Sequence, residues 1–229
     1  LNSFGEGTVC WTFNASEYSC ADTISHEIGH TVGLRHDGLN TDSGAPLDEY
    51  YGGHGDGETS WGPIMGSRSR AVEITGFENV NVTQWSIGEY TNASLQQDDL
   101  QIIVTGNNGL GFRDDDHPSN FETAGLNSID ESAVSNLGPM VEQNGIIERN
   151  TDEDWFSFLS DGGQLNLTAT VLDVLSERGV ESGSDTFGSN LAVSLSLLDS
   201  DLVVINESSP EDSLGAELDL TLPSGLYYI

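Results

Sequence analysis

Apolar residues recur at helical spacing in one segment near the start of the chain. Between residues 19 and 32, Ile24, Ile28 and then either Thr31 or Val32 recur at helical spacing, which predicts an α-helix. Gly33 comes directly after this segment, and glycine readily adopts the left-handed conformation that ends many helices. We therefore expect the helix to end at Val32 and the chain to change direction at Gly33.

The pattern around this helix predicts a small mixed domain. Residues 8–13 alternate apolar and polar side chains as a β-strand does, and residues 92–104 carry apolar positions spaced as in a second helix. Residues 37–62 are rich in Gly, Asp, Ser and Thr, which indicates a long loop. A loop of this length inside a domain is usually functional or braced by a metal. Residues 1–105 are therefore expected to form one domain.

From about residue 146 onward, the apolar positions alternate with a period of two. Several short alternating strands between turns predict an all-β sandwich. Residues 106–145 are polar and lack this pattern, so we place the domain boundary near residue 106 and assign a linker and the sandwich to residues 106–229. The apolar runs lie at residues 155–158, 165–171, 191–197, 202–205 and 218–222.

The charge of the chain narrows the range of partners. The sequence has 38 acidic and 6 basic residues, for a net charge of −32 at pH 7. Such a charge excludes nucleic acid and anionic membrane surfaces as partners, and no apolar run is long enough to span a bilayer. The sequence leaves two interpretations of the acidic residues open: they keep the surface hydrated, or some of them bind Ca²⁺.

The two cysteines, Cys10 and Cys20, enclose a short segment. An isolated pair of this kind is typical of one disulfide in an oxidising compartment, which favours an extracellular protein. Two free, buried thiols are the alternative.

His26, Glu27 and His30 form a His-Glu-x-x-His pattern on the predicted helix. Side chains four residues apart project from the same face of a helix, so both imidazoles can reach a single Zn²⁺ ion. Glu27 stands beside that ion without binding it. It can accept a proton from a zinc-activated water and later donate it to the leaving amine, so Glu27 is the candidate general base and acid.

His36 is the candidate third ligand. A continuing helix would carry His36 to the wrong side, but a turn at Gly33 lets the chain return to the same ion. Three protein ligands leave a fourth position open for water, as a catalytic zinc site requires. The other two histidines considered, His54 and His117, are not expected to bind the zinc.

The stretch from His26 to Asp37 resembles the metzincin signature H-E-x-x-H-x-x-G-x-x-H, and the Asp after the third His is similar to the reprolysin (adamalysin) branch. Met65, within Gly-Pro-Ile-Met-Gly, resembles the Met-turn that lies beneath the zinc in this family. The resemblance implies an α+β metzincin-like zinc peptidase subdomain, truncated at its N-terminus, with structural roles for Gly33, Asp37 and Met65. It further implies a secreted zinc metalloendopeptidase, a hydrolase whose substrate is a protein or peptide.

Residues 112–229 resemble the bacterial pre-peptidase C-terminal domain that accompanies secreted proteases, with the chain ending inside the last strand. The resemblance implies an accessory role, such as attachment to polysaccharide or another surface, and a plain spacer domain is the alternative. It rests on residues 114–123, 152–158, 163–171, 195–200 and 223–229.

A second hypothesis for the whole chain is a non-catalytic extracellular adhesion or matrix-binding module that retains a zinc site. Structural zinc sites usually have four protein ligands. The open fourth position and the intact Glu27 therefore favour the enzyme.

Overall fold

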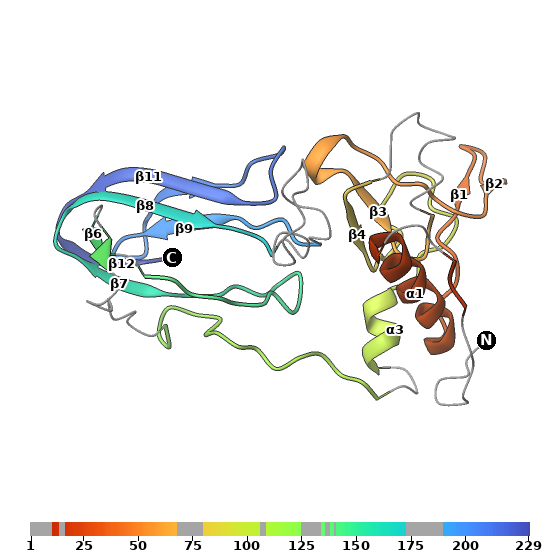
Figure 1. Cartoon of the computed structure of the whole chain (residues 1–229), viewed down its shortest axis with the longest axis horizontal. Coiled ribbons are helices and arrows are strands. Elements are labelled where there is room, and N and C mark those ends of the chain that lie inside the picture. Colours follow the sequence, from red (N-terminus) through yellow and green to blue (C-terminus); the bar gives the residue numbers. More distant parts are fainter. Residues whose placement is uncertain are drawn as a thin grey trace. The chain divides into compact units, whose positions relative to one another are not determined.

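The computed structural model describes residues 11–13, 17–67, 80–105, 109–124, 134–135, 138–139, 141–172 and 190–229. These residues form a mixed structure of short helices and several small β-sheets (Figure 1). The chain divides into two compact units: residues 1–111, 171–192 and 211–214 form unit 1, and the remaining residues form unit 2. The boundary predicted near residue 106 falls outside the described residues and stays a prediction. Among the described helices, none is long and apolar enough to cross a membrane.

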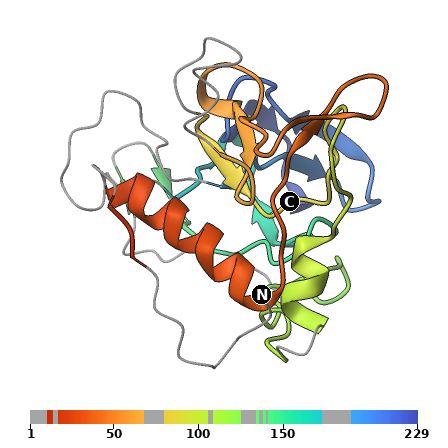
Figure 2. The same ribbon diagram turned by 90° about the vertical axis from the view of Figure 1, so that its right-hand side faces the viewer.

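Unit 1 combines two helices with short strands around them. Its β1 and β2 form an antiparallel pair, and β3 pairs with β4 in parallel. Figure 2 shows α1 and α3 side by side, and the two helices pack against each other. The elements are α1 (Glu17–Val32), β1 (Leu39–Asn40), β2 (Pro46–Asp48), the 3-10 helix η1 (Gly57–Thr59), β3 (Trp61–Pro63), β4 (Val82–Gln84) and α3 (Asp99–Thr105).

The predicted first helix is confirmed as α1, which begins slightly earlier, at Glu17. It ends as predicted, because Gly33 has a φ of 105°. The Gly33 N–H donates to the His30 carbonyl at 3.2 Å, and the Leu34 N–H donates to the Gly29 carbonyl at 3.0 Å. These two bonds form a Schellman motif, which satisfies carbonyls at the helix end and redirects the chain.

The predicted apolar face of α1 is wrong in part. Ile24 and Ile28 are 41% and 50% exposed, whereas Val32 is 4% exposed. Ile24 and Ile28 lie outside the core because the core forms at the C-terminal end of α1. This core consists of Val32, Leu34 and Met65, with Trp85, Ile102 and Ile103 packed against them.

The strand predicted over residues 8–13 is not found where the structure describes it. Residues 8–10 lie outside the described residues, and residues 11–13 are irregular. Trp11 and Phe13 are 78% and 93% exposed, so neither side chain packs into the core of the described residues.

The second helix is shorter than predicted, since residues 92–98 do not join α3. Asn92 has a positive φ of 61°, which breaks a helix. Its carbonyl accepts from Asn40 N–H at 2.8 Å, and Ser94 N–H donates to the Gly38 carbonyl at 3.0 Å. Because these backbone groups pair with the segment after His36, the helix begins only at Asp99.

The segment predicted as a loop, residues 37–62, is more ordered than expected. It contains β1, β2, η1 and the start of β3. Gly53 has a φ of 95°, and a Cβ there would lie 2.5 Å from the Trp61 carbonyl oxygen. Gly53 therefore allows two backbone segments to pack closely, in a stretch whose composition had predicted an irregular loop.

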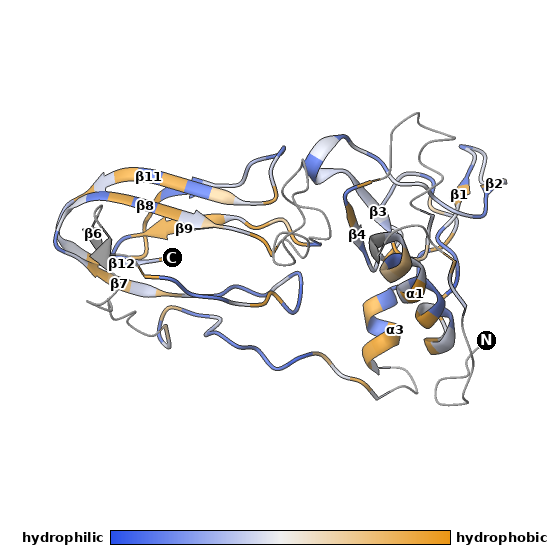
Figure 3. Ribbon diagram, in the orientation of Figure 1, coloured by the Kyte–Doolittle hydropathy of each residue, from blue (hydrophilic) through white to orange (hydrophobic). Residues whose placement is uncertain are grey.

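Unit 2 is built from antiparallel strands. One sheet has the order β10-β9-β12-β7, and β11 pairs with β8 in another. Side chains from both sheets form a single core around Leu197, Leu218, Leu222 and Tyr227, and Figure 3 shows hydrophobic residues along β8, β9 and β11. The strands are β5 (Val134–Ser135), β6 (Gly138–Pro139), β7 (Ser157–Ser160), β8 (Gly163–Ala169), β9 (Leu195–Leu198), β10 (Val204–Ser208), β11 (Ala216–Leu222) and β12 (Gly225–Tyr228).

Candidate metal centre

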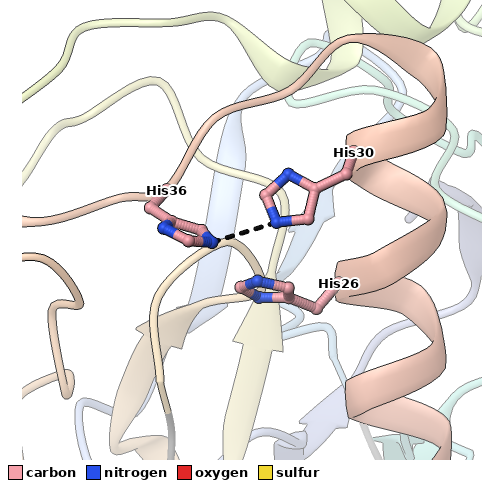
Figure 4. Close-up of side chains that lie close together, drawn as sticks. All are labelled: His26, His30 and His36. Atoms are coloured by element: carbon pink, nitrogen blue, oxygen red, sulfur yellow. Dashed lines mark hydrogen bonds between the residues drawn. The ribbon is translucent and has the colours of Figure 1, made fainter. Parts of the chain in front are cut away.

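The three predicted ligands converge at one point. His26 and His30 project from successive turns of α1, with ring centroids 4.9 Å apart, and the turn at Gly33 brings His36 back to them. Its ring lies 5.2 Å from that of His26 and 4.7 Å from that of His30 (Figure 4). One nitrogen from each ring lies within 4.8 Å of the others. The cluster therefore has the dimensions of a site for a metal ion.

Each of the three rings is oriented through its Nδ1 atom. His26 Nδ1 lies 2.8 Å from the Ile64 carbonyl oxygen, and His30 Nδ1 lies 3.0 Å from that of Leu34. His36 Nδ1 lies 2.8 Å from Oε1 of Glu49. Carbonyl and carboxylate oxygens only accept hydrogen bonds, so each Nδ1 carries the proton and donates it.

The remaining Nε2 atoms then carry lone pairs. Nε2 of His30 and Nε2 of His36 face each other at 3.0 Å, as the dashed line in Figure 4 marks. Two lone pairs at that distance repel unless a cation lies against both. Two nitrogens bound at 2.0–2.1 Å to one tetrahedral Zn²⁺ ion would be about 3.3 Å apart. The residues present therefore fit a zinc ion of the kind the sequence predicts.

Burial favours the neutral, metal-binding form of His26. It lowers the pKa of His26, and the neighbouring His30 and His36 lower it further, while the carbonyl of Ile64 and the charge of Glu27 oppose the shift. Metal ligation requires the neutral imidazole. A His26 that stays neutral at a lower pH is therefore available to a metal over a wider pH range.

Met65 lies directly beneath α1. It is fully buried, and a Cβ on Gly29 would lie 2.5 Å from its sulfur. The carbonyl before it, of Ile64, receives the His26 hydrogen bond, and its own carbonyl accepts from Asp37 N–H at 2.9 Å. The turn at residues 64–65 thus supports both the helix and the segment that follows the third histidine.

The side chain of Asp37 lies in a buried polar network. It is 1% exposed, and the Ser86 hydroxyl donates to its Oδ2 at 2.7 Å. Burial raises the pKa of Asp37 to about 6, although the bond from Ser86 lowers it. Its backbone carbonyl accepts from Tyr51 N–H at 2.6 Å. Asp37 therefore anchors the chain after His36.

Glu27 has an exposed side chain on α1, directly after the first histidine. Its charge is close enough to raise the pKa of His26 against the effect of burial. The carboxylate is thus close enough to the cluster to act on His26 and is exposed to solvent.

Two residues at the cluster were missed by the sequence analysis. Glu49 holds the ring of His36, and the ring of Tyr50 lies 4.3 Å from that of His36 and 6.2 Å from that of His26. Both come from the segment predicted as a loop, and no local pattern distinguishes them. The sequence offers one signal that could have identified them: an acidic residue, Glu49, directly followed by two aromatic residues in a polar segment.

The other candidate residues lie elsewhere. His54 is exposed and its Nδ1 lies 2.9 Å from the hydroxyl of Tyr51. His117 lies in unit 2. The sulfur of Cys20 lies 3.2 Å from Oγ1 of Thr12. Cys10 is outside the described residues, so its disulfide with Cys20 stays a prediction.

Comparisons with protein-family models, with curated proteins and with solved structures found no match for this chain.

The buried network behind His36 predicts a dependence of stability on pH. Burial, and then the charge of Asp37, raise the pKa of Asp99 from 3.8 to about 7, although Ser86 N–H donates to its Oδ2. Because Asp99 holds its proton more tightly in the folded state, it contributes fully to stability at a pH below its pKa in the unfolded chain. That contribution is lost as the pH rises through its pKa in the folded chain. Asp99→Asn is therefore expected to gain stability relative to the unsubstituted chain between pH 4 and pH 8.

Urea unfolding at both pH values, with a chelator present, measures this difference. Asp161→Asn, at an exposed aspartate, serves as the control and should show a constant difference. If Asp99→Asn has the same stability relative to the unsubstituted chain at both pH values, the ionised Asp99 does not destabilise the fold as we expect.

Proposed function

We propose that this protein is a secreted zinc-dependent endopeptidase that hydrolyses peptide bonds in protein or peptide substrates. The observation that carries the proposal is the convergence of the free Nε2 atoms of His26, His30 and His36 beside Glu27. All three Nδ1 atoms donate to oxygen acceptors, so each ring is held with its lone pair toward the same point. A site with three neutral nitrogen donors is typical of catalytic zinc.

The residues divide the chemistry between them. A zinc ion held there would polarise the scissile carbonyl and lower the pKa of a water molecule. Glu27 would accept the proton of the attacking water and then donate it to the leaving nitrogen, which needs a carboxylate that is ionised at the start. The exposed position of Glu27 leaves its carboxylate accessible to water.

The surrounding contacts orient the ligands. The carboxylate of Glu49 orients His36 and increases the electron density on its Nε2, as carboxylates do behind metal-bound histidines. The backbone carbonyls of Ile64 and Leu34 orient the other two rings. Preorganised ligands need little rearrangement when the metal binds, which favours a tight site.

Zinc reconstitution tests the proposal directly. The chain freed of metal by a chelator is expected to cleave no peptide bond, and about one equivalent of Zn²⁺ should restore cleavage of an unstructured protein. Zinc uptake is measured with a competing chromophoric chelator, and cleavage by mass spectrometry of the products, which also shows internal bonds being cut.

His36→Ala is expected to lower the zinc affinity by more than about tenfold and to abolish cleavage. His54→Ala removes an exposed histidine outside the cluster and is expected to change neither. A chain that binds zinc through these histidines yet cleaves no peptide library would instead support a non-catalytic binding module.

A further inference from the structure

His36 is the ligand of the histidine cluster that no regular element carries. His26 and His30 belong to α1, whose backbone hydrogen bonds fix the direction of both side chains. Residues 34–38 have neither helical nor strand structure. The place of His36 therefore depends on contacts with other parts of unit 1, and residues 49–51 supply them.

Residues 49–51 lie directly against the chain that follows the third ligand. The Tyr51 N–H donates to the Asp37 carbonyl at 2.6 Å. Gly38 lies at the closest approach, where a Cβ would be 2.8 Å from the carbonyl oxygen of Glu49. The two segments can come so near because residue 38 is a glycine.

The same segment is anchored on its other side through Tyr51. The ring of Tyr51 stacks on that of Tyr90, with centroids 4.0 Å apart and 3° between the planes. Tyr90 is 7% exposed, and its hydroxyl donates to the Gly38 carbonyl at 2.8 Å. The Tyr51 carbonyl accepts from the Ser67 N–H at 3.0 Å. The two residues before Tyr51 are therefore attached to a well-anchored part of the chain.

Glu49 alone is a weak support for the ring of His36. Its Oε1 accepts from His36 Nδ1 at 2.8 Å, but the side chain of Glu49 is 68% exposed. Water competes for such a bond, and a long exposed side chain loses conformational freedom when it is held, so pairs of this kind contribute little. A single hydrogen bond to the edge of the imidazole also leaves the ring free to tilt. A firm hold on the ring needs a second contact.

Tyr50 supplies the second contact. Its ring centroid lies 4.3 Å from that of His36, with 41° between the ring planes, and 6.2 Å from that of His26. The side chain of Tyr50 is half-buried. Rings this close attract each other through dispersion and their quadrupoles, and water does not replace that contact as it replaces a hydrogen bond. The ring of Tyr50 therefore limits the tilt of the imidazole.

We propose that Tyr50 is a positioning residue of the metal centre, whose ring holds the imidazole of His36 toward the other two ligands before a metal binds. The inference rests on the zinc site of the proposed function, but not on peptide cleavage. Tyr50 acts through His36 and is not itself a ligand. A ring that is already held loses less freedom when it binds a metal, so the contact should raise zinc affinity without changing the ligand set.

The zinc affinity of Tyr50 variants of the full chain, measured by competition with a chromophoric chelator, tests this role. Tyr50→Ala should lower the affinity by about three- to tenfold, the worth of one aromatic contact. Tyr50→Phe keeps the ring and should bind zinc within about twofold of the unsubstituted chain. Tyr228→Ala, which removes a half-buried tyrosine ring from unit 2, is the matched control and should leave zinc affinity unchanged.

Two further measurements separate positioning from a general loss of stability. In a chain that carries His36→Ala, Tyr50→Ala should not lower the remaining zinc affinity further, because its effect passes through the missing ring. With Co²⁺ in place of zinc, Tyr50→Ala should shift the visible absorption bands that report the coordination geometry, whereas Tyr50→Phe should leave them unchanged.

Equal zinc affinity in Tyr50→Ala and the unsubstituted chain would overturn the inference, and so would an undiminished effect of Tyr50→Ala in the absence of His36. A loss of affinity in Tyr50→Phe would show that the phenol oxygen acts on the metal, which also contradicts positioning by the ring. A chain that binds zinc and cleaves no peptide would contradict the proposed function alone, since affinity is the readout here. A chain that binds no zinc would overturn both.

Discussion

Replacing Glu27 by Gln is expected to lower kcat for peptide cleavage by about 10²–10⁴-fold and to leave zinc bound. The amide has nearly the same shape as the carboxylate but cannot accept a proton from water. Glu27 is not one of the three histidine ligands of the candidate site. The affinity for zinc should therefore stay within about twofold of that of the unsubstituted chain.

Steady-state cleavage of a fluorogenic peptide and zinc titration on the same preparation separate the two effects. Glu122→Gln, at an exposed glutamate of unit 2, controls for the loss of one negative charge from a very acidic chain. Retention of full activity by Glu27→Gln would refute the role of Glu27 as the base. A loss of zinc in parallel with activity would instead show that the residue holds the metal.

Gly29→Ala is expected to destabilise unit 1 by about 1–3 kcal/mol, as overpacking of a core usually does. In an ordinary helix the same substitution is stabilising by about 0.5–1 kcal/mol. Here a Cβ would lie 2.5 Å from the sulfur of Met65 and 3.2 Å from the ring of Trp85. Met65 is fully buried and has little room to move. A loss of stability would show that the collision with Met65 outweighs the higher helix propensity of Ala. A gain in stability would show the reverse.

The substitution should also reach the metal centre. Moving Met65 displaces the carbonyl of Ile64, which orients His26, and its own carbonyl, which holds Asp37. We therefore expect zinc affinity to fall together with stability. Both are measured by urea unfolding and by competition with a chelator.

A double-mutant cycle with Met65→Ala isolates the contact. If the Cβ at position 29 collides with the sulfur, removing the sulfur should make Gly29→Ala less harmful, with a favourable coupling of about 0.5–3 kcal/mol. Purely additive effects, or a stabilised single variant, would show that α1 is not packed on Met65 as described.

The first helix and its end could be predicted from the sequence because their causes are local. Apolar spacing and the conformational freedom of Gly33 act over a few residues, and α1 does end at Val32 with Gly33 at a φ of 105°. The spacing of His26 and His30 likewise follows from helical geometry alone. The alternating runs of unit 2 appear as strands for the same reason.

The extent of the second helix could not be predicted in this way. Residues 92–98 have helical apolar spacing, but the backbone of Asn92 and Ser94 bonds to the chain that follows His36. A hydrogen bond to a partner more than fifty residues away competes with the helical one, and no local pattern reports it.

The sequence by itself determined which residues can bind a metal and which turn can bring them together. The tertiary structure decided how they are held: Glu49 and two backbone carbonyls orient the rings, and Met65 sits against Gly29. Ligand identity is a property of single residues, whereas orientation depends on contacts between segments far apart in the chain.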